Sequence, residues 1–536
     1  MRIDTTEFGR IEISDVPLPG DARDATATYT YSGKVFVLYR RDSDPAGEDW
    51  YHAGVLEDDG TGFHPVFSGR IPQHPKANGV RHMMFADNRR VLLGDYVLEC
   101  SPDVDTCTRA RLVEVRYPWE LEANPLITHH WSEIIVSPDN EHLAWTMLRS
   151  DMGAAAAIGR LRRTDGCYLV ENAKLISTVD PLLPDPARAG HVVPQPQRGG
   201  EVKQFVRGGT AISIVGSGGG PLPDSVIQDL ASEELIPLTR TPGYDETTIL
   251  SPDERLGVVM TSRASERTDP AILGLLPRPH SGLTGMALAW TIYTYTVTGV
   301  RQFRRGNIGP VLIDIEKSRH EPGYRGVPLN DPDDSWVYVS PMSWHPDSRR
   351  ALWLEMRRGT EQPGRYREIR VRKAVLLDRE PQPPIATQPV PADIPYAVDG
   401  ELAREFLSRP VEQTLSCRIA GRHSGYLEYE RQAADIRTGS AGSSRSRYVD
   451  FSDDGRSVCS GYEQVVSSFT ADTVYEADLK LTGEQDGELR LRATWSSIAG
   501  PTPARLLFDV AGDGKPKSHG LSRYGDRILR IEDLSE

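Results

Sequence analysis

The sequence predicts an all-β protein, a β-propeller of six blades (five to seven) with a C-terminal β-sandwich-like extension. The first observation behind this prediction is that apolar and polar residues alternate with period two along most of the 536 residues, without a long amphipathic helix. The second is one turn signature that recurs between apolar stretches, at Ser137-Pro138-Asp139-Asn140, Ser251-Pro252-Asp253-Glu254, His345-Pro346-Asp347-Ser348 and Ser452-Asp453-Asp454-Gly455.

The recurring turn has a clear physical basis. Proline fixes φ near the start of the turn, and the aspartate side chain accepts hydrogen bonds from the backbone that follows. Each signature with its two flanking apolar stretches therefore predicts a β-hairpin. A hairpin that recurs along a chain indicates a repeated supersecondary unit, and repeated four-stranded units close into a propeller.

Six such units follow one another along the chain. The first spans about residues 25–69, and the second carries Ala86-Asp87-Asn88 in place of the usual turn. The third, fifth and sixth contain the first three turns named above, and the fourth reads VKQFVRGGTAISIVGSGGG from Val202. This order predicts one blade for each unit.

The clearest boundary is a proline-rich segment, residues 379–395. Proline lacks the N–H group that a sheet interior needs, so we expect an extended, semi-rigid linker. It separates the propeller blades, residues 1–378, from a C-terminal β-rich region, residues 396–536. Because the Ser452 turn lies beyond the linker, the sequence leaves open whether this region also contributes a closing blade.

Two irregular segments interrupt the blades, residues 267–287 and a stretch that starts at Ile315. Both contain several prolines and break the strand pattern, and loops of this length in a compact fold are often covers or binding loops. From residue 287 to 303, the many threonine and tyrosine residues favour a strand over a short helix.

Charge and hydropathy narrow the range of partners. The chain has 62 Lys and Arg against 76 Asp and Glu, a net charge of −14, which argues against a nucleic-acid partner. No stretch resembles a membrane span, and the N-terminal residues lack the apolar core of a secretory signal. We therefore expect a cytoplasmic protein with no membrane partner, or a periplasmic or secreted one if a leader has been trimmed.

The chain contains five cysteines, an odd number without the spacing of a zinc site. Cys100 and Cys107 flank a turn and would face each other across a hairpin, where an oxidising compartment would allow a disulfide. Since a secretory signal is missing, two reduced thiols are the favoured interpretation.

At its turns the sequence resembles the TolB-type propeller repeat, in which a Ser-Pro-Asp-Gly-like turn joins two apolar strands. The resemblance covers about residues 25–378 and, more locally, residues 448–461. It implies a propeller fold without fixing one activity, because the superfamily includes periplasmic binding proteins, propeller domains of serine peptidases and oligosaccharide lyases. A peptidase would also need a hydrolase domain with a Gly-x-Ser-x-Gly elbow, which the sequence lacks.

The resemblance also implies that the strand before each turn is the innermost strand of its blade. Residues at equal distances before the turns should then meet around the central channel. Four residues before the Ser position stand His82, Glu133, Thr247, Pro341 and Tyr448, while neighbouring positions hold Arg81, Asp245, Glu246 and Arg447, with His129 and His130 a step further out.

These residues are unusually ionisable for positions that begin apolar strands. Buried charges need a partner, a ligand or a metal ion, and imidazoles beside a carboxylate suit a divalent metal ion or acid–base catalysis near neutral pH. We therefore expect His82, His130 and Glu133 to form a catalytic and metal-ligating centre, completed by Asp245 or Glu246. A divalent metal ion is the cofactor that this set suggests, and no nucleotide cofactor is indicated.

The other residues of the set would handle the substrate. Tyr448 would deliver or remove a proton as a further catalytic residue. Arg81 and Arg447 would orient a carboxylate or another anion, with Asp245 and Glu246 as additional substrate-binding groups. The competing interpretation is a polar channel that holds ordered water and carries out no chemistry.

Two functions of different classes fit these observations. The first is an enzyme, a lyase or hydrolase that acts on a small anionic or sugar-like molecule at the mouth of the channel. The alternative is a non-catalytic propeller that binds a ligand or a protein partner, since no strong catalytic motif is present. A detached peptidase-type propeller that works with another chain is a weaker third interpretation.

Overall fold

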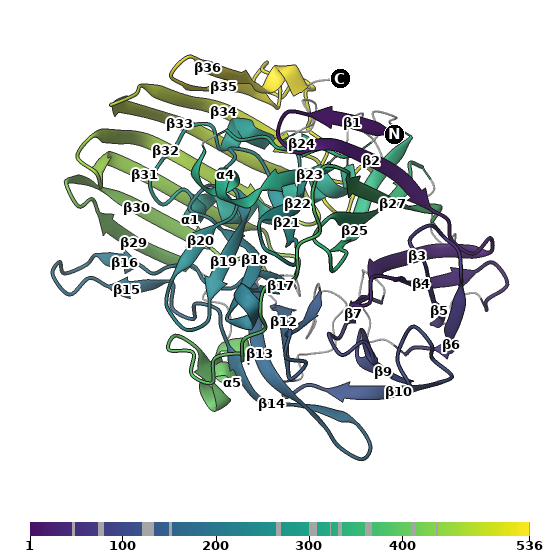
Figure 1. The fold of residues 1–536 in the computed structure, drawn as a ribbon. Coiled ribbons are helices and arrows are strands. Elements are labelled where there is room, and N and C mark those ends of the chain that lie inside the picture. The colour runs from purple at the N-terminus through teal and green to yellow at the C-terminus, as the bar shows by residue number, and fades with distance from the viewer. Residues whose placement is uncertain are drawn as a thin grey trace.

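In the computed structural model, blade-like sheets surround a central channel, and a larger sheet stands beside them (Figure 1). The structure describes residues 1–45, 49–72, 80–119, 133–149, 153–263, 270–299, 308–321, 323–330, 335–359, 367–408, 414–435 and 438–534. The described residues form six blades and a C-terminal β extension, so the predicted all-β propeller is confirmed.

Each blade is an antiparallel meander whose first strand lies next to the channel. Blades one to three contain β3 (Ala22–Tyr29), β4 (Val35–Arg41), β5 (Trp50–Leu56) and β6 (His64–Arg70); β7 (His82–Met84), β8 (Arg90–Leu93), β9 (Tyr96–Ser101) and β10 (Arg109–Arg116); and β11 (Ile134–Val136), β12 (His142–Leu148), β13 (Ala154–Arg163) and β14 (Tyr168–Leu175). Blades four to six contain β17 (Glu201–Val206), β18 (Ala211–Ser217), β19 (Pro223–Asp229) and β20 (Leu235–Pro237); β21 (Asp245–Leu250), β22 (Leu256–Thr261), β23 (Gly309–Asp314) and β24 (Val327–Pro328); and β25 (Trp336–Trp344), β26 (Arg350–Arg357), β27 (Ile369–Leu376) and β2 (Gly9–Val16).

The ring closes through its N-terminal strand. In blade six, β2 pairs antiparallel with β27, and β1 (Arg2–Thr5) continues the sheet outward. The alternating side chains of Ile11 and Ile13 are buried against the blade. The C-terminal region adds only the two-residue strand β28 (Val398–Asp399) to the outer strand of blade three. A closing blade from the C-terminal region, which the Ser452 turn suggested, is therefore not observed in the described residues.

The recurring turns have the expected hydrogen bonds. The Ser137 hydroxyl donates to Asp139, whose carboxylate also accepts from the Glu141 N–H at 2.9 Å. The fourth turn residue has positive φ, 64° at Asn140. Its side chain reaches the turn of blade two, since Asn140 Oδ1 accepts from the Asp87 N–H at 3.2 Å. The turns of blades five and six are linked in the same way, by a hydrogen bond from the Asp253 N–H to the Ser348 hydroxyl at 3.1 Å. We name the turns at this end of the channel the ring of turns.

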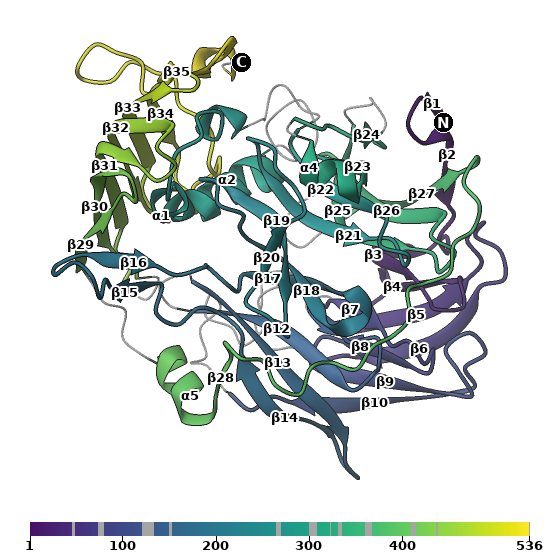
Figure 2. The ribbon, with the colours of Figure 1, turned by 60° about the vertical axis from the view of Figure 1, so that its left-hand side comes forward.

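The proline-rich segment, residues 379–395, crosses this ring of turns, and we name it the strap (Figure 2). Its backbone N–H groups donate to turn carbonyls of three successive blades: Gln382 to Asp347 at 2.9 Å, Ile385 to Pro252 at 2.9 Å and Gln388 to Gly208 at 2.8 Å. The donors are three residues apart, which is the repeat of a polyproline II helix and places them on one side. The expected extended linker therefore lies on the propeller.

Blade five carries a helical insertion between β22 and β23, and this insertion packs on the C-terminal sheet. The insertion contains η2 (Pro270–Leu273), α1 (Gly282–Gly285), η3 (Met286–Leu288), α2 (Ala289–Tyr293) and η4 (Thr294–Gly299). The expected strand in segment 287–303 is thus wrong for its described part, residues 287–299. Helical backbone satisfies its own hydrogen bonds, as a segment between two apolar layers requires.

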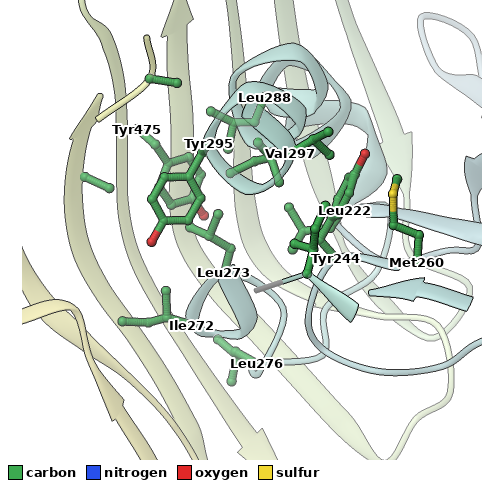
Figure 3. Close-up of a cluster of buried hydrophobic side chains, with 14 of the residues drawn as sticks. Leu222, Tyr244, Met260, Ile272, Leu273, Leu276, Leu288, Tyr295, Val297 and Tyr475 are labelled. Carbon is green, nitrogen blue, oxygen red and sulfur yellow. The ribbon is translucent and has the colours of Figure 1, made fainter. Parts of the chain in front are cut away.

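The C-terminal extension is one antiparallel sheet in chain order, and the insertion forms its second layer. Its strands are β29 (Thr414–Ala420), β30 (Ser424–Gln432), β31 (Gly442–Ser452), β32 (Ser457–Ser467), β33 (Thr473–Gly483), β34 (Gly487–Trp495), β35 (His519–Tyr524) and β36 (Arg527–Arg530). Figure 3 shows Leu288 and Tyr295 of the insertion with Tyr475 of β33 on one side and Tyr244 and Met260 of the propeller on the other. This core joins sheet and propeller.

Six smaller elements complete the described fold. β15 (Leu182–Pro184) pairs with β16 (Val192–Pro194), and the other four are short helices: η1 (Arg207–Gly209), α4 (Ile315–His320), α5 (Gly400–Ser408) and η5 (Ile531–Leu534). None of the helices in the described ranges has the length and apolar character that a membrane crossing requires. All five cysteines are free thiols, and Cys100 and Cys107 are both buried.

Candidate functional site

The inner strands bring the residues four positions before each turn to one cavity. His82, Glu133, Thr247 and Pro341 all line this cavity of about 410 Å³, which we name the channel cavity. The structure therefore brings together the residues that the turn alignment selected in blades two, three, five and six. The equivalent residues of blades one and four, Thr26 and Lys203, line the same cavity.

His82 is held in the wall of the channel cavity. Its Nδ1 and Nε2 atoms lie 3.1 Å from the Thr26 hydroxyl and 3.0 Å from the Thr28 hydroxyl. Burial, together with the charge of Arg81, lowers the pKa of His82 to about 3. The imidazole is therefore neutral near pH 7, and both of its nitrogens are engaged by hydroxyl groups.

The predicted metal centre depends on a residue outside the described part of the chain. His130, like His129, falls within residues 120–132. Among the residues that the structure does describe, no three His, Cys, Asp or Glu side chains are grouped so as to hold a metal ion. A divalent metal ion at His82, His130 and Glu133 thus stays a prediction.

Glu133 and Glu246 belong to a buried charge cluster at the mouth of the channel, the end away from the turns. The Lys203 Nζ atom lies 2.9 Å from Glu133, 2.8 Å from Glu201 and 3.8 Å from Glu246. The Tyr244 hydroxyl donates to Glu246 Oε2 at 2.8 Å. We name these five residues the mouth cluster.

Two carboxyl groups of the mouth cluster, those of Glu133 and Glu246, have pKa values that are shifted in opposite directions. Burial opposes the charge of Glu133, but Lys203 and Arg81 outweigh it and lower its pKa to about 2. Burial raises the pKa of Glu246 to about 7, with Lys203 opposing the shift and Glu201 adding to it. The neighbouring carboxylates raise the pKa of Lys203 against its burial. Glu133 is thus ionised at pH 7, while Glu246 exchanges a proton there.

Glu201, Tyr244 and Glu246 also face a second cavity of about 420 Å³, the mouth cavity. On its other sides this cavity is lined by the insertion, with Trp290 and Tyr293, and by the edge of the C-terminal sheet. The mouth cluster therefore forms the wall between the mouth cavity and the channel cavity. The propeller, the insertion and the C-terminal sheet together enclose the carboxyl group of Glu246.

Asp245 lies beside the mouth cluster but is not part of it, since its ion pair is with Arg263. Its fully buried carboxylate pairs with Arg263, whose Nη2 atom lies 2.6 Å away, and accepts from the Thr241 hydroxyl at 2.8 Å. These contacts tie the start of β21 to the end of β22. Asp245 lines neither of the two cavities described above.

Arg447 and Tyr448 do not converge with the channel, which corrects the turn alignment. Both belong to β31 of the C-terminal sheet. Arg447 is exposed and pairs with Glu428 at 3.2 Å, whereas buried Tyr448 donates to the Pro279 carbonyl at 2.8 Å. The Ser452 turn joins β31 to β32, and the same hairpin chemistry occurs in a sheet that is not a blade.

The sequence analysis missed Lys203, Glu201 and Tyr244. A signal for Lys203 was present, because it stands four residues before Arg207, which begins the glycine-containing turn of blade four. Aligning that turn with the Ser-Pro-Asp turns would have selected it. Glu201 and Tyr244 have no comparable pattern, since they lie outside that register position.

No protein-family model matches the chain, and no curated protein matches it. Solved structures similar to it include TolB from Acinetobacter baumannii, at 14% identity and a TM-score of 0.30 over 66% of this chain and 65% of that one. Another is prolyl oligopeptidase B from Galerina marginata, at 9% identity and a TM-score of 0.29 over 78% of this chain and 54% of that one. The chain spans just under two thirds of TolB and about half of the oligopeptidase. These likenesses concern the propeller fold alone.

Proposed function

We propose that the chain is a hydrolase that acts on a sugar-like molecule in the mouth cavity, with Glu246 as the group that donates the proton. The observation that carries this proposal is the pKa of Glu246, which burial raises to about 7, in a cavity wall that also contains Glu201 paired with Lys203. Two carboxyl groups in different protonation states are the usual requirement for acid–base hydrolysis.

The proposed step uses both groups. Protonated Glu246 donates its proton to the leaving oxygen as the C–O bond breaks, while anionic Glu201 accepts a proton from the water that attacks the carbon. Tyr244 fixes the orientation of Glu246 through its 2.8 Å hydrogen bond. Trp290 and Tyr293 offer aromatic faces on which the apolar side of a sugar ring packs.

Hydrolysis suits this site better than elimination, the other reaction that the sequence suggested. Elimination beside a carboxylate needs a cation to neutralise the developing negative charge. The ammonium group of Lys203 is already surrounded by three carboxyl groups. Because the ammonium group of Lys203 already neutralises these carboxyl groups, it is not available to stabilise an enolate. The site therefore fits a reaction that needs a proton donor and a base.

The test is a hydrolysis assay with a panel of chromogenic glycosides and oligosaccharides on the full chain. Glu246→Gln keeps the size of the side chain and removes its proton, so kcat should fall by about 10²- to 10⁴-fold with little change in KM. Asp224→Asn is the matched control, because Asp224 is a buried carboxyl group whose pKa burial also raises but which lines neither cavity. Equal activity of Glu246→Gln and wild type would refute the role of Glu246.

A ligand-binding propeller without catalysis is the second candidate. It is favoured by the way Lys203 contacts all three carboxyl groups of the mouth cluster, which is also what a purely structural network would show. Saturable binding of a saccharide by the wild type without product formation would support this candidate and overturn the hydrolase.

A further inference from the structure

The channel cavity contains a cation that has no anionic partner in the described part of the chain. The Arg81 Nη1 atom donates to the Ser340 hydroxyl at 3.1 Å, while its buried Nε atom has no hydrogen-bond partner. No ion pair links Arg81 to a described carboxylate. A guanidinium group offers five donors, so most of its hydrogen-bonding capacity is left for another group.

Glu133 is the nearby carboxylate. The charge of Arg81 helps to lower its pKa, but its ion pair is with Lys203, at 2.9 Å. Both ring nitrogens of His82 are engaged by threonine hydroxyls, so the imidazole is held in the cavity wall. The guanidinium group of Arg81 thus makes one hydrogen bond, to Ser340, and no ion pair with a described carboxylate, so it can bind an anion in the channel cavity.

The threonines beside His82 offer a further donor. A neutral imidazole has one N–H group and one lone pair, so one of Thr26 and Thr28 donates to the ring and the other accepts from it. The accepting threonine keeps its own O–H group for another acceptor. Since both threonines line the channel cavity, this donor adds to that of the arginine.

The body of the cavity is mostly apolar. Moving two residues along each inner strand toward the turns, four of the six strands place Met84, Ile135, Phe205 and Ile249 in its lining. The strap lines the turn end with Pro384, Ile385 and Thr387, together with Ser251 and Glu254 of the turns. Four strand residues span about 13 Å between the polar positions and the turns. The cavity thus has Arg81 at one end, an apolar body and the strap at the other end.

We propose that the channel cavity binds a small organic carboxylate, with its carboxylate on Arg81 and its apolar body against Met84, Phe205 and Ile249. The volume of about 410 Å³ lies in the range of small-molecule sites. A guanidinium group can hold a carboxylate through two parallel hydrogen bonds. This site is distinct from the mouth cavity and does not depend on the proposed hydrolysis.

Octanoate is the probe for this site, measured by isothermal titration calorimetry on the full chain. We expect one saturable site for octanoate and much weaker binding of octanol, which has the same body without the charge. Arg81→Gln should lower the affinity for octanoate by about tenfold or more, since it removes charge-assisted hydrogen bonds. Arg447→Gln is the matched control, because it removes an exposed arginine from the C-terminal sheet.

Two further measurements keep the test decisive. Ile249→Trp fills the apolar half and should abolish octanoate binding even if Arg81→Gln fails to fold. Saccharides that bind in the mouth cavity should not displace octanoate, which separates this site from the hydrolase. Equal affinity for octanoate and octanol, unchanged binding by Arg81→Gln, binding of inorganic phosphate but not octanoate, or no saturable binding by the folded wild type would each overturn the proposal.

Discussion

A buried ion pair fixes the insertion of blade five on the C-terminal sheet, and its removal gives the most informative stability measurement. Arg278 and Glu463 have fully buried side chains and make two contacts, Nε to Oε1 at 3.0 Å and Nη2 to Oε2 at 2.7 Å. Glu463 also accepts from the Tyr475 hydroxyl at 2.9 Å, and Arg278 Nη1 donates to the carbonyls of Leu273 and Leu276.

The expected cost follows from these contacts. Arg278→Met removes both charge-assisted hydrogen bonds and leaves the Glu463 carboxylate buried with only tyrosine donors. Removing one member of such a pair lowers the free energy of unfolding by about 3–5 kcal/mol. The double variant Arg278→Met, Glu463→Leu leaves no buried charge, so it should be closer in stability to the wild type than either single variant.

The assay is urea unfolding of the wild type, both single variants and the double variant, followed by circular dichroism. Arg447→Met is the control on the same sheet, because its pair with Glu428 is exposed and should contribute less than about 1 kcal/mol. If Arg278→Met costs no more than Arg447→Met, or if the double variant loses the sum of the two single losses, the reasoning about the buried pair is refuted.

Three further predictions concern the strap, the mouth cluster and ring closure. Gly208→Ala should speed hydrogen exchange in the strap, because the new Cβ atom overlaps a strap carbonyl oxygen, while Gly219→Ala, also at positive φ but in open space, should not. Because the pKa of Glu246 is about 7 when folded and about 4.5 when unfolded, it stabilises the fold below pH 4.5 and loses this effect as the pH rises through 7. The free energy of unfolding of the wild type should therefore fall by about 3 kcal/mol relative to that of Glu246→Gln between pH 4 and 8 in denaturant titrations. Ile13→Asp places a charge in the closing strand and should cost about 3 kcal/mol or more in thermal unfolding, whereas exposed Ser14→Asp should cost little.

The hairpins could be predicted from the sequence because the residues that determine each turn are adjacent in the chain. Proline, aspartate and a residue with positive φ identify each hairpin, and Asn140 has this conformation as expected. The closing strand could not be assigned in the same way. Its alternation marks β2 as a strand, but its partner β27 lies more than 350 residues further along the chain. Local patterns do not specify such a distant partner.

In the candidate site, too, positions that depend on local strand register could be predicted, whereas contacts between distant segments could not. Counting back from the turns placed His82 and Glu133 in the channel wall, because strand register is rigid between the turn and the residue four positions earlier. The same count failed for Tyr448, since a hairpin signature reports a hairpin and not the sheet that contains it. The partner of Glu133 is Lys203, which depends on how blades three and four meet.

The strap lies on the turns at one end of the propeller, and its sequence shows why it can do so. Its prolines at 381, 383, 384 and 389 avoid the three positions, 382, 385 and 388, whose N–H groups bind the turns. The composition of this segment predicts a spacer between domains, and the segment also forms hydrogen bonds with the turns. At this end of the channel the strap lines the channel cavity with Pro384, Ile385 and Thr387. At the opposite end the mouth cluster stands between the two cavities, with Glu133 and Lys203 in the wall of the channel cavity and Glu201, Tyr244 and Glu246 in the wall of the mouth cavity.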